Sequence, residues 1–184
     1  MTTRALWIIG SICTGLSAAP ADVRGELAAA EDVAVLSAIT TKMCKYAASH
    51  SGAHYQVLST QTSVVDRAPS SQDLDPGAVS SVVLRNKATH DLPPLTLCPG
   101  YRSAPQATIE AAMAREGWQG FYKAFPKSSG TSYLSLPGYT RDGNVAIVMV
   151  SGACDSLCAS SFFWVIRKVA GKWTFYKSVP WTIS

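Results

Sequence analysis

The stretch VAIVMVSGACDSLCASSFFWVI, residues 145–166, decides the expected fold. Two apolar runs in it flank Cys154 and Cys158, which are separated by the three residues Asp-Ser-Leu. Apolar runs joined by so short a loop are typical of an antiparallel hairpin. Facing Cα atoms at a hairpin neck lie about 5 Å apart, a separation that suits a disulfide. The sequence therefore predicts a hairpin closed by a Cys154–Cys158 bond.

Turn signals on both sides extend this hairpin into a meander. Asp142-Gly143 indicates a tight turn between a strand over residues 132–139 and the strand that starts at Val145. Ala170-Gly171 indicates the next turn, before a final strand over residues 173–178. Because the two middle strands carry apolar residues at odd and even positions, both faces of the sheet should be covered. A helix layer covers one face; a curled sheet, a second packed segment or a partner subunit covers the other, so a homodimer stays open.

Two helices are expected to pack with the meander. The first spans residues 26–47, and the second begins at the S-x-x-Q capping box of residues 103–106 and ends at Gly117. The first carries an apolar stripe at helical spacing, formed by Leu36, Ile39, Met43 and Tyr46. An aromatic cluster after the second fills the core, with a ligand groove as the alternative, and comprises Trp118, Phe121, Tyr122 and Phe125. The expected fold class is α+β: an antiparallel C-terminal meander of about four strands packed with two main helices and stapled by disulfides.

The remaining segments have weaker patterns. Residues 55–65 are rich in Thr, Val and Ser and predict a strand, and residues 67–78 predict a long exposed loop. Residues 79–84 fit a short strand or a helical turn equally well. Residues 91–100 contain three prolines around Cys98 and predict an extended segment at the surface.

The N-terminus has the pattern of an export signal. Arg4 precedes the uncharged residues 5–19, which are too few to span a bilayer, and an A-x-A site follows at residues 19–21. We therefore assign residues 1–21 to a signal peptide and residues 22–184 to a single domain that is periplasmic or secreted. No later segment reaches about 18 apolar residues, so no transmembrane segment is expected after signal removal.

The cysteines fit export to an oxidising compartment. Cys13 leaves with the signal peptide, and the four that remain imply two disulfides. If the hairpin neck joins Cys154 to Cys158, the other bond joins Cys44 to Cys98. A zinc site is disfavoured because neither pair has C-x-x-C spacing. Redox catalysis by the five-residue ring is the lesser alternative, because the gap departs from the two-residue dithiol motif and no helix follows.

Composition and motifs exclude several functions. Hydrophobic residues make up 47% of the chain and charged ones 15%, which favours a compact globule. The net charge of +4 comes without a run of basic residues and interleaved aromatics, so no nucleic-acid partner is expected. No hydrolase elbow, phosphate loop, dinucleotide fingerprint or zinc-protease motif occurs. We assign no catalytic, cofactor-binding or metal-binding residues; His50 and His54 stand four apart, but Gly52 interrupts the helix between them.

Several pieces of the C-terminal part occur in a recognisable order. They are W-x-x-F-Y-x-x-F-P within residues 117–126, LSLPGY at residues 134–139, C-x-x-x-C at residues 154–158 and the turn at residues 168–173. This order resembles an uncharacterised family of small exported bacterial proteins. The resemblance implies this architecture and export, and it brings no activity.

Two functional hypotheses follow. The first is a non-catalytic binding or interaction module of the cell envelope, of the inhibitor or immunity type, which meets an envelope protein or small ligand through a loop or the outer face of the sheet. The second is a small envelope hydrolase in which His50 or His54 approaches a serine or a metal. A histidine within hydrogen-bond reach of a nucleophile in a concave pocket would favour the enzyme.

Overall fold

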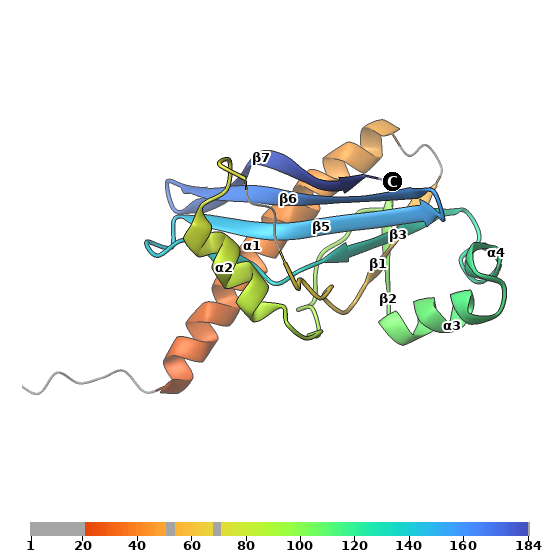
Figure 1. Cartoon of the computed structure of the whole chain (residues 1–184), viewed down its shortest axis with the longest axis horizontal. Helices are drawn as coiled ribbons and strands as arrows, with labels where there is room; N and C mark the ends of the chain where they lie inside the picture. Colours follow the sequence, from red (N-terminus) through yellow and green to blue (C-terminus); the bar gives the residue numbers. More distant parts are fainter. Residues whose placement is uncertain (1–20, 51–53, 68–70, 184) are drawn as a thin grey trace, which may run out of the picture.

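The computed structural model describes residues 21–50, 54–67 and 71–183, which form four helices around one sheet of seven strands (Figure 1). The expected signal peptide therefore lies outside the described residues, apart from Ala21. The helices are α1 (Ala21–His50), α2 (Pro76–Arg85), α3 (Gln106–Glu116) and α4 (Trp118–Ala124). The strands are β1 (Tyr55–Ser59), β2 (Tyr101–Ala104), β3 (Ser128–Leu134), β4 (Gly138–Tyr139), β5 (Val145–Asp155), β6 (Cys158–Val169) and β7 (Lys172–Ile183).

The sheet is mixed, with the order β2-β1-β3-β5-β6-β7, and β4 pairs with β5. Strands β3, β5, β6 and β7 are antiparallel neighbours, which confirms the predicted meander and the α+β class. Strand β1 runs parallel to both β2 and β3, an extension that the sequence did not predict. Parallel neighbours need a long crossover, and helices α2, α3 and α4 lie in those connections.

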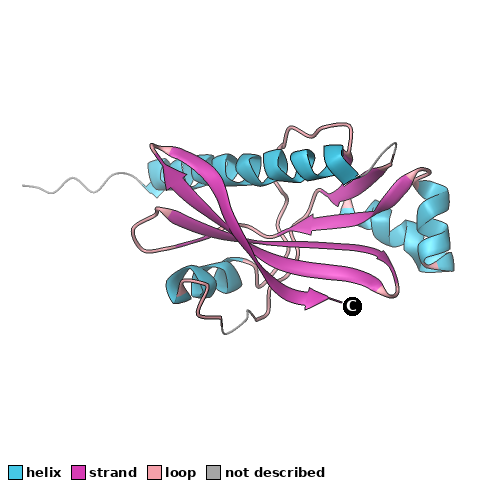
Figure 2. Cartoon of the chain, turned by 90° about the horizontal axis from the view of Figure 1, so that it is seen from above, coloured by secondary structure: helices cyan, strands magenta, loops and turns pink. Residues whose placement is uncertain are grey.

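Helices cover both faces of the sheet (Figure 2). Helix α1 packs on one face, where Leu36 and Ile39 join a buried cluster with Val148 of β5 and Ile166 of β6. Helix α2 packs on the opposite face against the alternate side chains of the same strands, including Ile147. The second face is therefore covered by another segment of the chain, which was one of the three predicted solutions.

Helices α3 and α4 lie on the same side of the sheet as α2, next to strands β1 and β2. Their buried residues Ile109 and Phe121 pack against Tyr55 and Val57 of β1. Gly117 separates the two helices at φ 56°, a left-handed conformation that glycine adopts without steric cost. The predicted end of the second helix at Gly117 is thus confirmed.

The structure decides one open alternative and corrects two local predictions. The ambiguous residues 79–84 belong to α2, because Asp75 caps the helix by accepting the Ala78 N–H at 2.9 Å and Pro76 occupies the first turn. This helix also shortens the predicted loop over residues 67–78. The predicted capping box is wrong, since Ser103 lies in β2 and α3 begins without a side-chain cap bond.

Two predicted strands are shorter or broken. Strand β1 ends at Ser59, whose hydroxyl bonds both the carbonyl and the N–H of Gln61 and turns the chain. The strand expected over residues 132–139 divides into β3 and β4 around Pro137. Beyond it, Gly138 lies against the backbone of α2, where any side chain would collide with Val82.

Both disulfides form as predicted. The tip disulfide, Cys154–Cys158, closes the β5–β6 hairpin with Cα atoms 5.2 Å apart. The α1 disulfide, Cys44–Cys98, ties α1 to the extended segment of residues 91–100 with Cα atoms 5.9 Å apart. The two disulfides fit an extracytoplasmic protein. Within the described residues, no helix is long and apolar enough to span a membrane.

A partly buried ion pair joins α1 to α2. Arg85 donates two hydrogen bonds to the Asp32 carboxylate, at 2.9 and 2.6 Å, and a third to the Pro137 carbonyl at 2.6 Å. The Tyr139 hydroxyl donates to the same carboxylate at 2.8 Å. Burial and this hydrogen bond raise the pKa of Tyr139, so its hydroxyl remains a donor at all physiological pH values. The ion pair therefore fixes α1 to both α2 and β4.

Candidate functional site

The tip of the β5–β6 hairpin is open to solvent. The four tip residues, 155–158, are all exposed, and Leu157 has the highest exposure of the large hydrophobic residues at 85%. Asp155 and Cys158 face each other as the last pair of the ladder, after an irregularity in its register. Ser156 and Leu157 form the turn itself.

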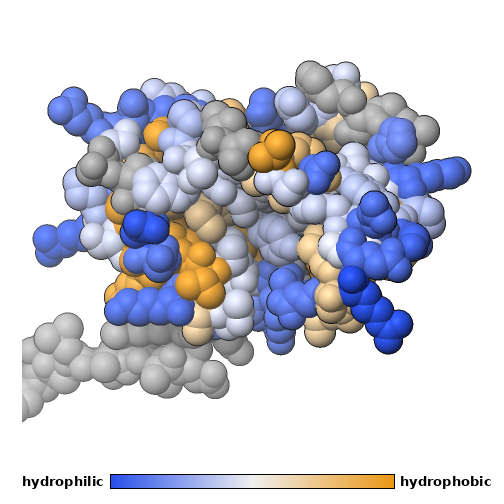
Figure 3. All heavy atoms as spheres, turned by 45° about the vertical axis from the view of Figure 1, so that its right-hand side comes forward, coloured by the Kyte–Doolittle hydropathy of each residue, from blue (hydrophilic) through white to orange (hydrophobic). Residues whose placement is uncertain are grey.

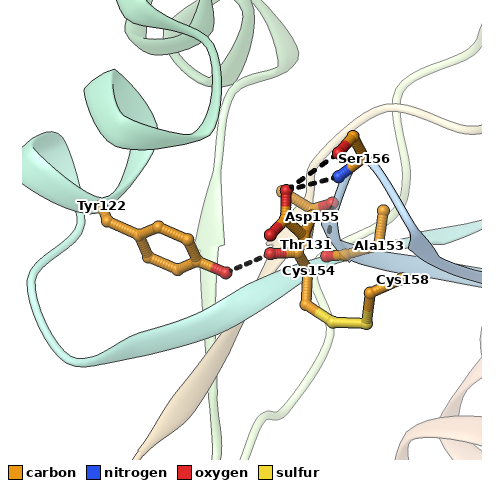
Figure 4. Close-up of a disulfide and its surroundings, with 7 residues drawn as sticks. All are labelled: Tyr122, Thr131, Ala153, Cys154, Asp155, Ser156 and Cys158. Carbon is orange, nitrogen blue, oxygen red and sulfur yellow. Dashed lines mark hydrogen bonds between the residues drawn. A yellow bond between two sulfur atoms is a disulfide. The ribbon is translucent and has the colours of Figure 1, made fainter.

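The tip disulfide and a side chain from another element hold this loop in place (Figure 4). The Tyr122 hydroxyl of α4 donates a hydrogen bond of 2.5 Å to the Cys154 carbonyl. Within the turn, the Ser156 N–H and hydroxyl both donate to the Asp155 carboxylate, at 2.6 and 3.2 Å. Three restraints therefore hold the loop: the disulfide, the bonds from Ser156 to Asp155 and the bond from Tyr122 of α4.

An aromatic cluster positions Tyr122. Phe121 is fully buried, and its ring centroid lies 5.3 Å from that of Tyr122 and 5.0 Å from that of Phe125. Trp118 completes the cluster, with its ring centroid 5.3 Å from that of Phe121 in an edge-on arrangement. These contacts fit the predicted core-filling role. Burial raises the pKa of the Tyr122 hydroxyl, and the nearby Asp155 charge acts in the same direction, so Tyr122 stays protonated.

The tip presents apolar and polar groups side by side. Leu157 offers an apolar side chain, and Asp155 and Ser156 offer a carboxylate and a hydroxyl beside it. The space-filling view shows apolar side chains in separate patches among polar residues on the face turned forward (Figure 3). A restrained loop has little conformational entropy left to lose when another molecule binds it.

The predicted histidines do not meet a nucleophile in the described residues. His54 is exposed, and its Nδ1 lies 3.2 Å from the Lys127 backbone carbonyl. His90 is exposed as well, and its backbone N–H bonds the Thr62 hydroxyl. His50 ends α1, and its side chain lies outside the described structure. In the described ranges, no three His, Cys, Asp or Glu side chains come together as metal ligands.

An open groove runs beside the α1 disulfide and has a volume of about 560 Å³. Its walls are the outer side of α1 and residues 96–98. Thr40 and Thr41 lie in it, but both hydroxyls donate to the Ser37 carbonyl of their own helix. These two hydroxyls are therefore engaged within their own helix.

No protein-family model, curated protein or solved structure matches this chain. Sequence reasoning found Cys154, Cys158 and the aromatic cluster but missed the contact between Tyr122 and the Cys154 carbonyl. No local pattern marks this bond, because its partners are 32 residues apart and one is a backbone atom.

Proposed function

We propose that this protein is a non-catalytic binding module of the cell envelope, periplasmic or secreted, that engages a protein partner through the tip of the β5–β6 hairpin. Its mode of action is of the inhibitor or immunity type, in which a preformed loop enters or blocks a site on the partner. The observation that carries the proposal is the exposure of Leu157, at 85%, on a loop closed by a disulfide and held by Tyr122.

The energetics of the tip support this role. Complete burial of an exposed leucine side chain stabilises a complex by about 1.5–3 kcal/mol. In a free loop, ordering the backbone would cost about 1–2 kcal/mol for each residue, which would cancel that gain. The tip disulfide and the bond from Tyr122 restrict the loop before binding, so more of the gain remains as affinity.

The compartment belongs to the same proposal. The signal-peptide pattern of residues 1–21 and the oxidised cysteines favour export of a single domain over residues 22–184. Export would bring the tip into contact with proteins of the envelope or of the surrounding medium.

The test is a comparative capture from an envelope extract. Immobilised wild-type protein, Leu157→Asp and the matched control Leu84→Asp are incubated with the extract, and retained proteins are quantified by mass spectrometry. Leu84 is a suitable control because it is 66% exposed and lies on α2, away from the hairpin tip. We expect one protein to be retained in stoichiometric amount by wild type and Leu84→Asp, and to be lost from Leu157→Asp. Equal retention by all three proteins, or no partner on the wild type, would contradict the proposal.

A further inference from the structure

Two turns lie side by side at the end of the sheet opposite the hairpin tip (Figure 1). The β4–β5 turn covers residues 140–144, and the β6–β7 turn covers residues 170–171. The Lys168 N–H donates to the Asn144 carbonyl at 2.8 Å, which joins the β4–β5 turn to the end of β6. Arg167 pairs with Val145 in the β5–β6 ladder directly beside them.

Cationic side chains gather on these turns, and we call this surface the basic end. It consists of Arg141, Arg167, Lys168 and Lys172. Arg141, Arg167 and Lys172 are exposed, whereas Lys168 pairs with Glu31 at 2.7 Å. Asp142 is the other carboxylate there, and bonds from Thr140 and Asn144 hold its pKa below the ordinary value. Among the side chains that the structure describes at this end, four cations thus lie with two carboxylates.

The basic end also has an apolar tip. Around the β6–β7 turn the sequence reads Lys168-Val-Ala-Gly-Lys172, so an apolar segment is bracketed by lysines. Val169 is 59% exposed at its start. Tyr176 is 50% exposed nearby, and the Arg167 guanidinium lies 3.5 Å from its ring centroid. Apolar and aromatic side chains flanked by Lys and Arg are the combination that binds the interface of an anionic bilayer.

Helix α1 begins at this same end of the molecule (Figures 1 and 2). Its Glu31 is held by both Lys168 and the Trp173 indole N–H, each at 2.7 Å, so the helix is anchored beside the β6–β7 turn. The uncharged residues 5–19 precede α1 directly in the sequence. The helix that follows the export pattern in the sequence therefore starts at the basic end of the sheet.

We propose that the basic end docks on anionic phospholipid headgroups, with Arg141, Arg167 and Lys172 at the phosphates and Val169 inserted at the interface. The hairpin tip then points away from the membrane, because it lies at the opposite end of β5 and β6. This inference does not depend on the proposed partner of the tip.

The test uses protein purified from the envelope of the producing cell, with its N-terminus read by mass spectrometry. Binding to sedimented vesicles of phosphatidylglycerol in phosphatidylcholine is compared with binding to phosphatidylcholine alone. The test variant is the triple Arg141→Gln/Arg167→Gln/Lys172→Gln. The control triple removes exposed charges elsewhere, at Lys45, Lys87 and Arg115, and changes the net charge by the same amount. Thermal unfolding checks that both triples fold.

We expect wild type to bind only the anionic vesicles, and the test triple to bind them about 100-fold more weakly, because each cation near the surface contributes about 1 kcal/mol. The control triple should lose much less. Val169→Ser should weaken binding about fivefold through its lost apolar contact, whereas Leu84→Ser should not. Absence of binding to anionic vesicles, or equal loss in the two triples, would overturn the inference. An unchanged affinity of Val169→Ser together with equally tight binding to polyglutamate would overturn it in favour of an acidic protein surface.

Discussion

Replacing Asn86 by leucine tests whether one buried side chain holds the junction of α2 with the sheet. Asn86 follows α2 and is completely buried. Its amide nitrogen donates to the Val82 carbonyl at 2.7 Å and the Leu136 carbonyl at 3.0 Å, and its oxygen accepts the Leu136 N–H at 2.7 Å. Leucine has a similar shape and none of these bonds, so the expected cost is that of the abandoned backbone groups.

All three partners would lose a bond, and two of them have no other bond among those that the structure shows. The Val82 carbonyl lies in the last turn of α2. The Asn86 backbone N–H, which would be its helical donor, bonds the Val83 carbonyl instead. The Leu136 N–H likewise has the Asn86 side chain as its acceptor. The Leu136 carbonyl keeps a bond from the Ser135 hydroxyl. An unsatisfied buried group costs about 1–3 kcal/mol, so the two together predict a loss of about 4 kcal/mol.

Urea unfolding at equilibrium measures this loss as a lower midpoint with an unchanged slope. The matched control is Asn144→Leu, in an exposed turn, which should change stability by less than about 0.5 kcal/mol. If Asn86→Leu lost no more than the control, the reasoning from orphaned backbone groups would be refuted.

Three further predictions concern the disulfides, acid stability and the tip. Replacing both cysteines of the α1 disulfide by serine should lower the free energy of unfolding by about 4 kcal/mol, because this disulfide closes the longer loop. The same change at the tip disulfide should lower it by about 2 kcal/mol. Urea unfolding of the two double variants shows which of them is less stable. Hydrogen bonds from Lys168 and Trp173 lower the pKa of Glu31, so its contribution to stability is present above the ordinary value of 4.5 and is lost as the pH falls through the lowered value. Lys168→Met should therefore flatten the acid limb of the stability curve, and an identical limb would contradict this assignment. Tyr122→Phe removes the bond to the Cys154 carbonyl and should speed amide exchange in residues 154–158 with a global loss of only about 1 kcal/mol, measured by hydrogen exchange; unchanged exchange would mean that the disulfide alone orders the tip.

Features of the fold that depend on neighbouring residues were predictable. The Asp142-Gly143 turn, the turn at residues 170–171 and the Gly117 helix end all appear where local chemistry places them. Turn residues act through their own backbone conformation, so they need no distant partner. Residues 79–84 were not predictable in this way, because so short a segment fits a strand or a helix equally well. Asp75, which caps α2 and so decides for a helix, lies outside these residues.

The candidate site was predictable only in part. Cysteine spacing was enough to predict the closed loop, and helical spacing was enough to group Tyr122 with the other aromatic residues. The bond from Tyr122 to the Cys154 carbonyl needed the packing of α4 beside the sheet. The parallel pairing of β1 and the ion pair of Asp32 with Arg85 also escaped prediction, because non-local contacts leave no period in a sequence.

The sequence by itself determined the hairpin, its sulfur bond and the need to cover both faces of the sheet, since alternation and spacing act over a few residues. Only the tertiary structure decided that α2 covers the second face, that the hairpin tip and the basic end lie at opposite ends of the sheet, and that Tyr122 restrains the tip. These arrangements depend on how elements far apart in the chain pack, and packing is settled by the shapes of all the side chains together.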